Sequence, residues 1–427
     1  MPPSTTKPSP SPSPTPTLLT SLRTALQHRK SKNSLRRLTL IPPTSTDFSS
    51  NDFLSLSTSP LFRARYTTHL SSAPPFYPFA SGGSRLLTGN SPYAEALETF
   101  IASFHNAPSG LLFNSGFDAN VGVLSCIPQP GDVIIHDEYI HASAHEGMRL
   151  SRAGRKIPFA HSCPQSLEDV LRREVENDEK LKSGERNVFI VIESIYSMDG
   201  DIAPIREFVE VVERVMKGKG NANAYFIVDE AHATGAFGPR GAGVVQELGV
   251  EEKMFIRVHT FGKALGSHGA IVLCCPDTRE YLINYARSLI YTTALGFPFL
   301  ASIRTAYEML AEGETEELQR NLQHLIEYLG NRLDALGSWD PDVFEVDHFP
   351  RSPIFSLRSP VPRQLAAACQ RKGFMVHPIM SPTVPKGKER VRVCLHAGNT
   401  VEEIDGLVET ILAWLNGRES EKRVARL

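Results

Sequence analysis

The chain has 427 residues, of which 41% are hydrophobic and 22% charged, the composition of an ordinary globular protein. This length predicts two or three structural units and excludes a chain that is mainly disordered, collagen-like or coiled-coil. Lys and Arg number 45 against 47 Asp and Glu, a formal net charge of -2. That balance gives no electrostatic basis for binding nucleic acid or an anionic membrane surface.

The first residues of the chain and its cysteines indicate the cellular compartment in which the protein is expected. Residues 1–17 are rich in Pro, Ser and Thr and are expected to form a disordered tail, because they cannot bury enough apolar surface. The start also lacks the hydrophobic core of a secretory signal, and no apolar run reaches the roughly 18 residues of a membrane span. Six cysteines without Cys-x-x-Cys spacing favour reduced thiols in an intracellular protein and predict no metal site.

The first half of the chain alternates between strand and helix patterns. Helical spacing of leucines predicts a helix over 18–26. Nearly continuous apolar runs over 188–194, 224–232 and 269–275 predict strands buried on both faces. Helical periodicity over 205–216, between the first two runs, completes a β-α-β unit. We therefore predict an α/β fold with a mostly parallel central sheet covered by helices on both faces.

After about residue 297 the pattern changes to that of a smaller α+β domain. Helices are predicted over 299–310 and 316–336, short strands near 354–357, 375–378 and 390–395, and a last helix over 401–415. The expected organisation is a tail over 1–17, an N-terminal arm over 18–60, a large domain over 61–297, a small C-terminal domain over 298–417 and a flexible tail over 418–427.

Three side chains suited to one cofactor follow predicted strands. Asp229 ends an apolar strand, His232 follows three residues later, and Lys263 lies in the Gly-rich stretch 260–266. Pyridoxal phosphate needs a lysine for its aldehyde, an acid at its pyridine nitrogen and a cradle for its phosphate. Residues 114–117, Asn-Ser-Gly-Phe before a predicted helix, can supply the cradle through amides at the helix start. Each feature alone has an ordinary alternative (a surface lysine, a helix cap or a turn), but their joint occurrence favours the cofactor.

Six segments occur in the order and context that they have in the α-oxoamine synthases, and the chain resembles this family from about residue 35 to 415. The segments are Ser-Gly-Gly-Ser-Arg at 81–85, Ser-Gly-Phe at 115–117, Ile-His-Ala-Ser at 140–143, Glu-Ser-Ile-Tyr-Ser-Met-Asp-Gly-Asp at 193–201, Val-Asp-Glu-Ala-His-Ala-Thr-Gly at 228–235 and Thr-Phe-Gly-Lys at 260–263. The resemblance implies a fold-type I transferase that uses pyridoxal phosphate to condense an amino acid with an acyl-CoA, releasing carbon dioxide and CoA.

The resemblance also implies roles around the cofactor. Lys263 would hold the cofactor and then remove the α-proton, Asp229 would pair with the pyridine nitrogen, and His141 would stack on the ring. His232 and Ser197 would contact the phenolic oxygen of the ring. The phosphate would lie among Gly116, Phe117 and Thr260. The ordinary alternative for His141 and His232 is a satisfied buried histidine.

Substrate contacts and assembly are implied in the same way. Arg392 matches the arginine that binds the amino-acid carboxylate, a task suited to its bidentate fork, although a strand-edge surface arginine is its alternative. Thr383 and Arg36 match substrate-contacting positions, and basic clusters such as the one around Arg36 are often only solvated. Glu193 would support the site from behind. The family assembles as homodimers with sites at the interface, where Thr292 or Thr293 would reach the partner's phosphate.

Within the family, three segments are most similar to the branch that acts in biotin synthesis: Ser-Met-Asp-Gly-Asp at 197–201, Pro-Thr-Val-Pro at 382–385 and Arg-Val-Arg-Val at 390–393. That branch condenses L-alanine with pimeloyl-CoA. Two segments depart from the family pattern, Phe-Leu-Ser-Leu at 53–56 and Leu-Gly-Phe-Pro at 295–298. The alternatives are enzymes resembling serine palmitoyltransferase or glycine C-acetyltransferase, and a non-catalytic scaffold subunit with the same fold.

The last three residues, Ala425-Arg426-Leu427, share the chemical pattern of the peroxisomal address Ser-Lys-Leu. We expect them to lie on a mobile tail, where a receptor can read them. Three residues match so loose a pattern often by chance, but the absence of an export signal and the acyl-CoA substrate agree with it. The sequence therefore predicts a peroxisomal protein, with the cytoplasm as the alternative.

Overall fold

The structure, a computed structural model, describes residues 17–74, 77–216, 223–337, 339–340, 343–346 and 351–424, with the backbone alone over 419–424. It divides into two compact units, Met1–Ser45 and Thr46–Leu427, and each is described by itself. The predicted tail over 1–17 lies outside the described residues except for Thr17. In the first unit, α1 (Thr17–Ser31) contains the helix predicted over 18–26 and has no buried residue.

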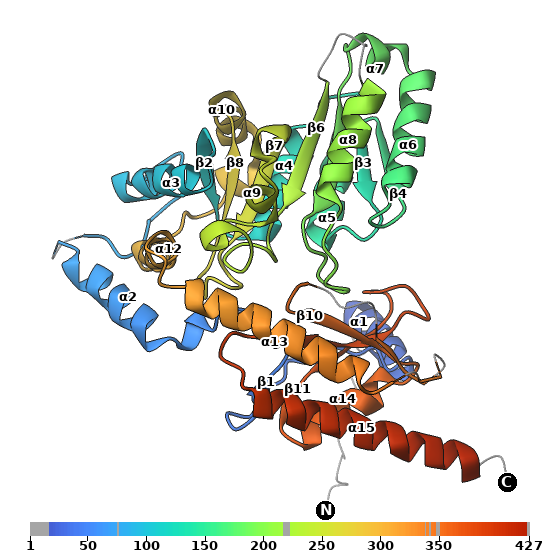
Figure 1. The fold of residues 1–427 in the computed structure, drawn as a ribbon. Helices are drawn as coiled ribbons and strands as arrows, with labels where there is room; N and C mark the ends of the chain where they lie inside the picture. Colours follow the sequence, from blue (N-terminus) through green and yellow to red (C-terminus); the bar gives the residue numbers. More distant parts are fainter. Residues whose placement is uncertain are drawn as a thin grey trace, which may run out of the picture. The chain divides into compact units, whose positions relative to one another are not determined.

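The second unit is built on a seven-stranded sheet (Figure 1). Its strands are β2 (Ser109–Phe113), β3 (Val133–Asp137), β4 (Arg155–Phe159), β5 (Val188–Glu193), β6 (Ala224–Asp229), β7 (Met254–Thr260) and β8 (Ala270–Cys274), in the order β2-β8-β7-β6-β5-β3-β4. β8 runs antiparallel to both of its neighbours, β2 and β7, and the other strand pairs of the sheet are parallel. The mostly parallel sheet predicted from the sequence is therefore confirmed.

Helices cover both faces of this sheet, which explains why its strands are apolar throughout. In β5, Val188, Ile190 and Ile192 belong to one buried cluster, whereas Phe189 and Val191 belong to a second cluster on the other face. The first cluster receives α3 (Pro92–Phe104), α6 (Pro164–Asn177), α8 (Ile205–Met216), α9 (Val244–Leu248) and α12 (Phe297–Ala311). The second receives α4 (Gly116–Cys126), α5 (Ala142–Leu150), α10 (Pro276–Tyr285) and α11 (Arg287–Ile290).

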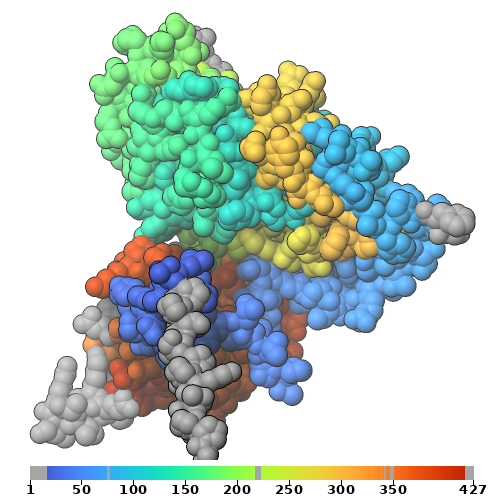
Figure 2. All heavy atoms as spheres, turned by 180° about the vertical axis from the view of Figure 1, so that it is seen from behind, coloured from blue at the N-terminus to red at the C-terminus, as the bar shows by residue number. Residues whose placement is uncertain are grey.

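The surface view shows how segments distant in sequence meet at one edge of the sheet. In Figure 2 the gold surface of residues around 280 lies against the light-blue surface of residues around 100. An ion pair joins them, because Arg279 Nη2 lies 2.8 Å from Glu98 Oε2. Glu98 is only 3% exposed and also pairs with Arg85 Nη1 at 2.7 Å. The carboxylate thus joins the Gly-rich segment that precedes α3 to the helix that follows β8.

A second sheet of four antiparallel strands follows in the chain. Its strands are β9 (Glu345–Val346), β10 (Ile354–Arg358), β12 (His377–Ile379) and β13 (Arg390–Cys394), in the order β12-β13-β10-β9. The helices of this part are α13 (Glu316–Asp334), α14 (Pro362–Arg371) and α15 (Val401–Val424). A short strand, β1 (Thr46–Asp47), pairs in parallel with β11 (Phe374–Met375). Residues 46–60, predicted as part of an N-terminal arm, therefore fold with the second unit.

The last helix is longer than the sequence predicted, whereas the flexibility of the tail over 418–427 stays a prediction. The last helix was expected to end near residue 415, but α15 continues to Val424. Residues 418–423 read Arg-Glu-Ser-Glu-Lys-Arg, mostly strong helix formers. Gly417 costs about 1 kcal/mol relative to alanine in a helix interior, which good neighbours can offset.

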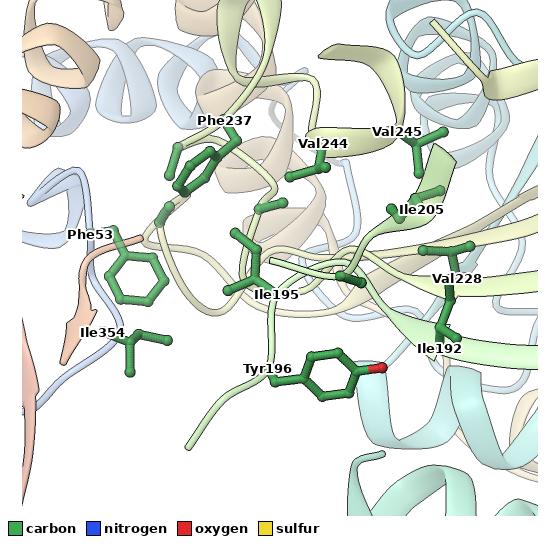
Figure 3. Packing of buried hydrophobic residues seen from close by; sticks show 14 of the residues in the cluster. Phe53, Ile192, Ile195, Tyr196, Ile205, Val228, Phe237, Val244, Val245 and Ile354 are labelled. Carbon is green, nitrogen blue, oxygen red and sulfur yellow. The ribbon is translucent and has the colours of Figure 1, made fainter. Parts of the chain in front are cut away.

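One buried cluster reaches from the large sheet into the small one. It contains Ile192 and Val228 of the large sheet, Ile354 of β10 and Phe53 of the segment after β1. Figure 3 shows Phe53 and Ile354 facing Ile195 across this cluster. The packing therefore fixes residues 46–58 and the small sheet beside the loops that follow β5.

Two further findings bear on the sequence predictions. All six cysteines are free thiols. None of the helices in the described part of the chain combines the length and the apolar character that a bilayer span requires.

Candidate active site

A cavity of about 220 Å³ lies where the parallel strands of the large sheet end. β5 and β6 end side by side, with Glu193 paired in register with Asp229, and β7 ends at Thr260. The carboxyl ends of such strands are the usual ligand site of a doubly wound sheet. Eight residues singled out from the sequence line this cavity: Gly116, Phe117, His141, Glu193, Asp229, His232, Thr260 and Lys263.

Asp229 is held by two donors at the floor of the cavity. Its Oδ2 accepts a hydrogen bond from Asn120 Nδ2 at 2.7 Å, and its Oδ1 accepts from the backbone N–H of Ala231 at 2.9 Å. The Asn120 amide also donates to Ser143 Oγ at 3.0 Å, and that hydroxyl lies 2.7 Å from His141 Nδ1. A chain of polar contacts thus orients both Asp229 and the imidazole of His141.

Asn120 and Ser143 were not identified from the sequence. Asn120 is 5% exposed and lies on α4, one helical turn after Gly116, so the spacing to Gly116 was the available signal. Ser143 is fully buried and follows His141 by two residues. Small polar side chains in a helix carry no sequence signal that separates a functional contact from an ordinary buried hydrogen bond.

Lys263 and Glu193 have shifted ionisation equilibria in this cavity. Burial lowers the pKa of Lys263 to about 8, against the opposing attraction of Asp229 and Glu193. Burial, reinforced by the charge of Asp229, raises the pKa of Glu193 well above its usual range. A lysine with a lowered pKa has an appreciable fraction of free amine near neutral pH, and such an amine can act as nucleophile and base.

The amino end of α4 forms an anion cradle at the cavity wall. Ser115 caps the helix, its Oγ accepting from the N–H of Asp118 at 3.0 Å. Among the hydrogen bonds between described residues, none uses the N–H of Gly116 or Phe117. A Cβ at Gly116 would come within 2.4 Å of the Thr260 methyl group, so only glycine fits this close approach. The hydroxyl of Thr260 is buried and finds no partner within the described part of the chain.

His232 lies deeper, next to the segment that follows β1. The side chain is 5% exposed, and its Nδ1 has no partner among the described residues. Burial and the nearby charges of Lys263 and Arg392 lower the pKa of His232 well below its usual value. Its ring centroid lies 6.0 Å from that of Phe53, one of the positions at which the sequence departs from the family pattern. The imidazole is therefore neutral and offers a free nitrogen.

Arg392 approaches the cavity from β13. Its charge contributes to the lowered pKa of both Lys263 and His232, although it is not among the residues that line the cavity. Its Nη2 donates to Asn51 Oδ1 at 2.6 Å. Its Nε is buried without a partner in the region that the structure describes, which leaves capacity to bind an anion. Asn51 was also not identified from the sequence.

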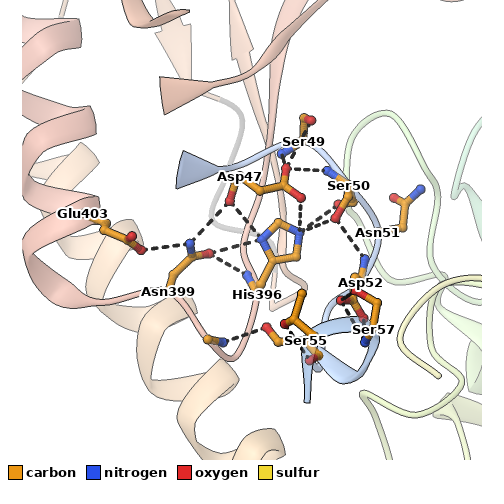
Figure 4. A network of polar contacts seen from close by, with 12 residues as sticks. Asp47, Ser49, Ser50, Asn51, Asp52, Ser55, Ser57, His396, Asn399 and Glu403 are labelled. Carbon is orange, nitrogen blue, oxygen red and sulfur yellow. Dashed lines mark hydrogen bonds and ion pairs between the residues drawn. The ribbon is translucent and has the colours of Figure 1, made fainter. Parts of the chain in front are cut away.

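A polar network fixes the turn that precedes Asn51 (Figure 4). His396, just after β13, contacts the turn over residues 47–50 with both ring nitrogens. Its Nδ1 lies 3.0 Å from the carbonyl oxygen of Asp47, and its Nε2 lies 2.9 Å from Ser50 Oγ. The side-chain amide of Asn399 donates to the same Asp47 carbonyl at 3.3 Å. The Asp47 carboxylate accepts from the N–H of Ser50 at 3.0 Å and closes the turn. Asn51 therefore leaves a turn that is fixed to the end of β13.

Two residues with predicted roles, Ser197 and Thr383, are not among those that line the cavity, and a third, Arg36, belongs to the other unit. Ser197 is half-buried in the turn after β5, which is closed by the pairing of Ile195 with Ile202. Thr383 is exposed, and its N–H donates to the carbonyl oxygen of Met380. Arg36 belongs to the separately described unit 1–45 and is exposed there. The roles of these three residues stay predictions.

The two threonines predicted to reach a partner's phosphate lie behind the anion cradle. The side-chain amide of Asn114 donates to Thr292 Oγ1 at 3.1 Å and to the carbonyl oxygen of Thr293 at 2.8 Å. Asn114 immediately precedes the cap of α4, so the segment around Thr292 is tied to the cradle. The predicted contact across an interface remains a prediction.

Pyridoxal phosphate fits these residues. The cavity offers a lysine amine with a lowered pKa, a carboxylate oriented by Asn120, an anion cradle with unused N–H groups and a buried hydroxyl without a partner. These are the groups that the aldehyde, the pyridine nitrogen and the phosphate of the cofactor require. The sheet topology and the cavity together define a pyridoxal phosphate-dependent enzyme of fold-type I.

Comparison with known proteins gives the family. The model for aminotransferase class I and II matches residues 43–411. The 8-amino-7-oxononanoate synthase of Emericella nidulans is 68% identical over 94% of this chain and 97% of its own length. Among solved structures, the 8-amino-7-oxononanoate synthase of Francisella tularensis is 26% identical with a TM-score of 0.70, covering 88% of this chain and 100% of that chain. A serine palmitoyltransferase of Sphingomonas wittichii is 25% identical with a TM-score of 0.75, covering 93% and 96%. The chain belongs to the aminotransferase class I and II family and, within it, to the α-oxoamine synthases, as its sequence motifs predicted.

Proposed function

We propose that this enzyme condenses L-alanine with pimeloyl-CoA and releases carbon dioxide, CoA and 8-amino-7-oxononanoate in biotin biosynthesis. The observation that carries the reaction class is the cavity in which Lys263, with its pKa lowered to about 8, meets Asp229. The choice of substrates is supported by the 68% identity to a relative named 8-amino-7-oxononanoate synthase.

The residues of the cavity divide the chemistry between them. Bound pyridoxal phosphate supplies an electron sink for the negative charge that develops at the α-carbon of the amino acid. The amine of Lys263 holds the cofactor and, once displaced, takes the α-proton. Asp229 keeps the proton on the pyridine nitrogen, and Asn120 holds its carboxylate in the orientation for that contact. His141 packs against the ring, with its imidazole oriented by Ser143.

Arg392 and Asn51 provide the site for the amino-acid carboxylate. The guanidinium of Arg392 is oriented by Asn51 at 2.6 Å and retains an unpaired Nε. It binds the carboxylate while the α-carbon attacks the thioester carbonyl and the carbon–sulfur bond to CoA breaks. Departure of the carboxylate as carbon dioxide then frees the arginine. His232, neutral and with a free Nδ1, is placed to polarise a carbonyl oxygen during these steps.

The substrate proposal is tested by measuring CoA release with alanine, glycine and serine, each against pimeloyl-CoA and palmitoyl-CoA. We expect the highest kcat/KM for the pair alanine and pimeloyl-CoA. A preference for serine and palmitoyl-CoA would assign a serine palmitoyltransferase-like activity instead. Absence of turnover with every pair, together with absence of visible cofactor absorbance, would identify a scaffold subunit.

We also propose that the enzyme is a homodimer. Three large apolar side chains are exposed near the cavity or the anion cradle: Phe117 (48%), Phe299 (48%) and Tyr291 (71%), which precedes the Thr292 that Asn114 contacts. Phe117 lines the cavity, and the ring of Phe299 lies 5.3 Å from that of His268, which also lines it. Apolar patches of this kind mark protein interfaces, and a second copy of this chain is the occupant that the family resemblance implies.

Sedimentation of the wild-type protein and of Phe299→Asp tests the homodimer. We expect a dimer for the wild type and a shift toward monomer with loss of activity for the variant, because a buried unpaired charge at an interface is costly. The control is Leu412→Asp on α15, where the side chain is also exposed (36%). A wild-type enzyme that is active as a monomer would contradict the proposal.

Localisation is a separate proposal. Residues 425–427, Ala-Arg-Leu, lie outside the described residues, directly after the end of α15 at Val424. We propose that they direct import into peroxisomes in the chain whose last residue is Leu427. A fluorescent protein fused to the amino terminus should give puncta that become diffuse when Ala425 to Leu427 are deleted. A diffuse signal from the intact fusion would reject the address and leave the cytoplasm.

A further inference from the structure

A charged cluster outside the cavity lining lies between the loop that leads to His141 and the turn that contains Ser197. The imidazole of His161, which follows β4, is 18% exposed as a side chain and contacts a carboxylate with each ring nitrogen. Its Nδ1 lies 2.9 Å from Asp137 Oδ1, and its Nε2 lies 3.1 Å from Asp201 Oδ2. Carboxylate oxygens accept hydrogen bonds, so both ring nitrogens donate and the ring carries a positive charge.

Aromatic rings and backbone contacts enclose this imidazolium. Tyr139 stacks on the ring at a centroid distance of 4.5 Å, and Tyr196 meets it edge-on at 4.5 Å. The N–H of His161 donates to Glu138 Oε1 at 3.0 Å. Burial opposes the charge, but the hydrogen bonds to the two carboxylates outweigh it and raise the pKa of His161 to about 10. The ring is therefore fixed in position as well as in charge.

The residue after His161 adopts a strained conformation that serves the same two carboxylates. Ser162 has φ +49°, in the left-handed region that serine rarely occupies. In this conformation its N–H donates to Asp137 Oδ2 at 2.8 Å and its hydroxyl donates to Asp201 Oδ2 at 2.8 Å. Strain of this kind persists where the surroundings impose it, and it often accompanies a functional arrangement.

The two carboxylates belong to the loops that present His141 and Ser197. Asp137 ends β3, and its Oδ1 also accepts from the N–H of Tyr139 at 2.8 Å, in the loop that leads to His141 at the start of α5. Asp201 closes the turn that contains Ser197, because its carbonyl oxygen accepts from the N–H of Tyr196 at 3.1 Å. His161 thus joins the loop after β3 to the turn after β5, the strand that ends at Glu193, whose side chain lines the cavity.

The far side of the turn is held by the small sheet. Arg390 of β13 is 1% exposed and pairs with the carboxylate of Asp199, and its Nη1 lies 3.3 Å from the carbonyl oxygen of Met198. Ser352 Oγ donates to the carbonyl oxygen of Gly200 at 2.6 Å. The turn is therefore held on both sides, and removal of His161 would leave only the small sheet and the contact of Ser162 Oγ with Asp201 to hold it among these contacts.

We propose that His161 is a positioning residue for the cofactor site: the imidazolium ties the loop that bears His141 to the turn that bears Ser197. The inference rests on the cofactor chemistry proposed above but not on the identity of the amino acid or the acyl-CoA. The test of His161 can therefore fail while the substrate assignment stands, and the substrate assignment can fail while the role of His161 stands.

The test titrates the apo form of the full chain with pyridoxal phosphate and follows visible absorbance and visible circular dichroism. For His161→Gln we expect the cofactor Kd to rise about tenfold or more, the effect of losing hydrogen bonds to a charged group, and the visible dichroism to change. His69→Gln is the matched control, because Nε2 of His69 on α2 (Pro60–Ser72) pairs with Glu308 of α12 at 2.8 Å, away from these loops. That variant should keep its Kd within about twofold of the wild type.

Double-mutant cycles separate positioning from a general loss of stability. In the background that combines His141→Ala with Ser197→Ala, His161→Gln should change the cofactor Kd by less than about threefold, since both groups that it positions are already gone. Equal effects of His161→Gln in this background and in the wild type, or an unchanged Kd and dichroism with a lower Tm, would overturn the proposal.

Asp201→Asn provides a second variant if His161→Gln does not fold. It keeps the contact between His161 and Asp137 and weakens only the link to the turn. We expect its effect on the cofactor Kd to disappear in the Ser197→Ala background but to persist in the His141→Ala background. The opposite pattern, or a wild-type Kd, would show that the cluster is only structural.

Discussion

Two buried histidine clusters of this enzyme contain the same side chain in opposite charge states. In the first, His161 lies between the carboxylates of Asp137 and Asp201. In the second, the ring centroids of His105 and His259 lie 4.0 Å apart with the ring planes tilted by 33°, both side chains are fully buried, and no carboxylate of the described residues is bonded to either ring. His105 instead contacts the carbonyl oxygen of Ala242 at 3.1 Å and the hydroxyl of Tyr307 at 2.9 Å.

The partners, more than the burial, decide the charge. Burial lowers the pKa of His105 to about 3, and the neighbouring charge of Arg257 adds to the effect. Burial also acts against the charge of His161, yet hydrogen bonds to two carboxylates raise its pKa to about 10. His105 is therefore neutral and His161 charged, because only His161 has carboxylates bonded to its ring.

Lys263 lies between these two cases, because burial and carboxylates both act on it and its pKa settles near 8. The largest expected effect of any substitution follows from that intermediate state. Lys263→Ala should reduce CoA release by about 10⁴-fold or more and abolish the visible absorbance of bound cofactor, since it removes both the attachment point and the base. Lys263→Arg, which keeps the charge but not a free amine, should be as inactive. Substantial turnover by either variant would remove the basis of the mechanism.

The charge of His161 gives the next largest effect, on stability. The pKa of His161 is higher in the folded protein than the value of about 6.5 in the unfolded chain. Its charge therefore stabilises the folded state fully below about pH 6.5, and this contribution is lost as pH rises toward 10. His161→Gln should therefore lower the free energy of unfolding by on the order of 2 kcal/mol at pH 6, a figure reduced because Asp201 is 34% exposed. Urea unfolding of both proteins between pH 6 and 10 measures it. A difference that grows with pH would contradict a charged His161.

Much of this architecture could be predicted from the sequence because it follows from hydrophobic periodicity. The runs over 188–194 and 224–232 predicted β5 and β6 to within a few residues, since strands buried on both faces must be apolar throughout. The same rule placed Asp229 at a strand end. It could not place the segment 46–58, whose two-residue strand β1 depends on pairing with β11, more than 300 residues away.

The candidate site was predictable where a motif surrounds the residue, as for Lys263, His141 and Asp229, which line one cavity. Asn51 and Asn120 were missed because each acts through a partner that only the fold brings near, Arg392 in one case and Asp229 in the other. The charge of His161 was hidden for the same reason. Asp137 and Asp201 lie 24 and 40 residues from it in the sequence, and a lone histidine is more often an ordinary buried side chain.

For the neutral pair His105 and His259 we expect stability to depend on pH in the direction opposite to that for His161. The pKa of His105 is lower in the folded protein than in the unfolded chain. Its contribution to stability is therefore present above about pH 6.5 and is lost as pH falls toward 3. His105→Phe should cost on the order of 1 to 2 kcal/mol at pH 8, because Tyr307 and the carbonyl of Ala242 lose their partner. The difference in free energy of unfolding between the two proteins should shrink at pH 5. At that pH His105 is protonated in the unfolded wild-type chain but not in the folded one, which lowers the stability of the wild type alone. A difference that is constant from pH 5 to 8 would show that His105 is not held neutral.

The smallest expected effect concerns the backbone beside each histidine. The residue after His161 is Ser162 with φ +49°, and the residue after His105 is Asn106 with φ +51°. Asparagine tolerates this conformation better than serine does, so strain is concentrated in the charged cluster. Ser162→Ala and Ser162→Gly both lose the hydroxyl contact with Asp201 and keep the N–H contact with Asp137, but only glycine relieves the strain. We therefore expect the alanine variant to be less stable than the glycine variant by about 1 kcal/mol in urea unfolding. Equal stabilities of the two variants would mean that the left-handed conformation at position 162 has no energetic cost. Ser162 would then contact both carboxylates without backbone strain.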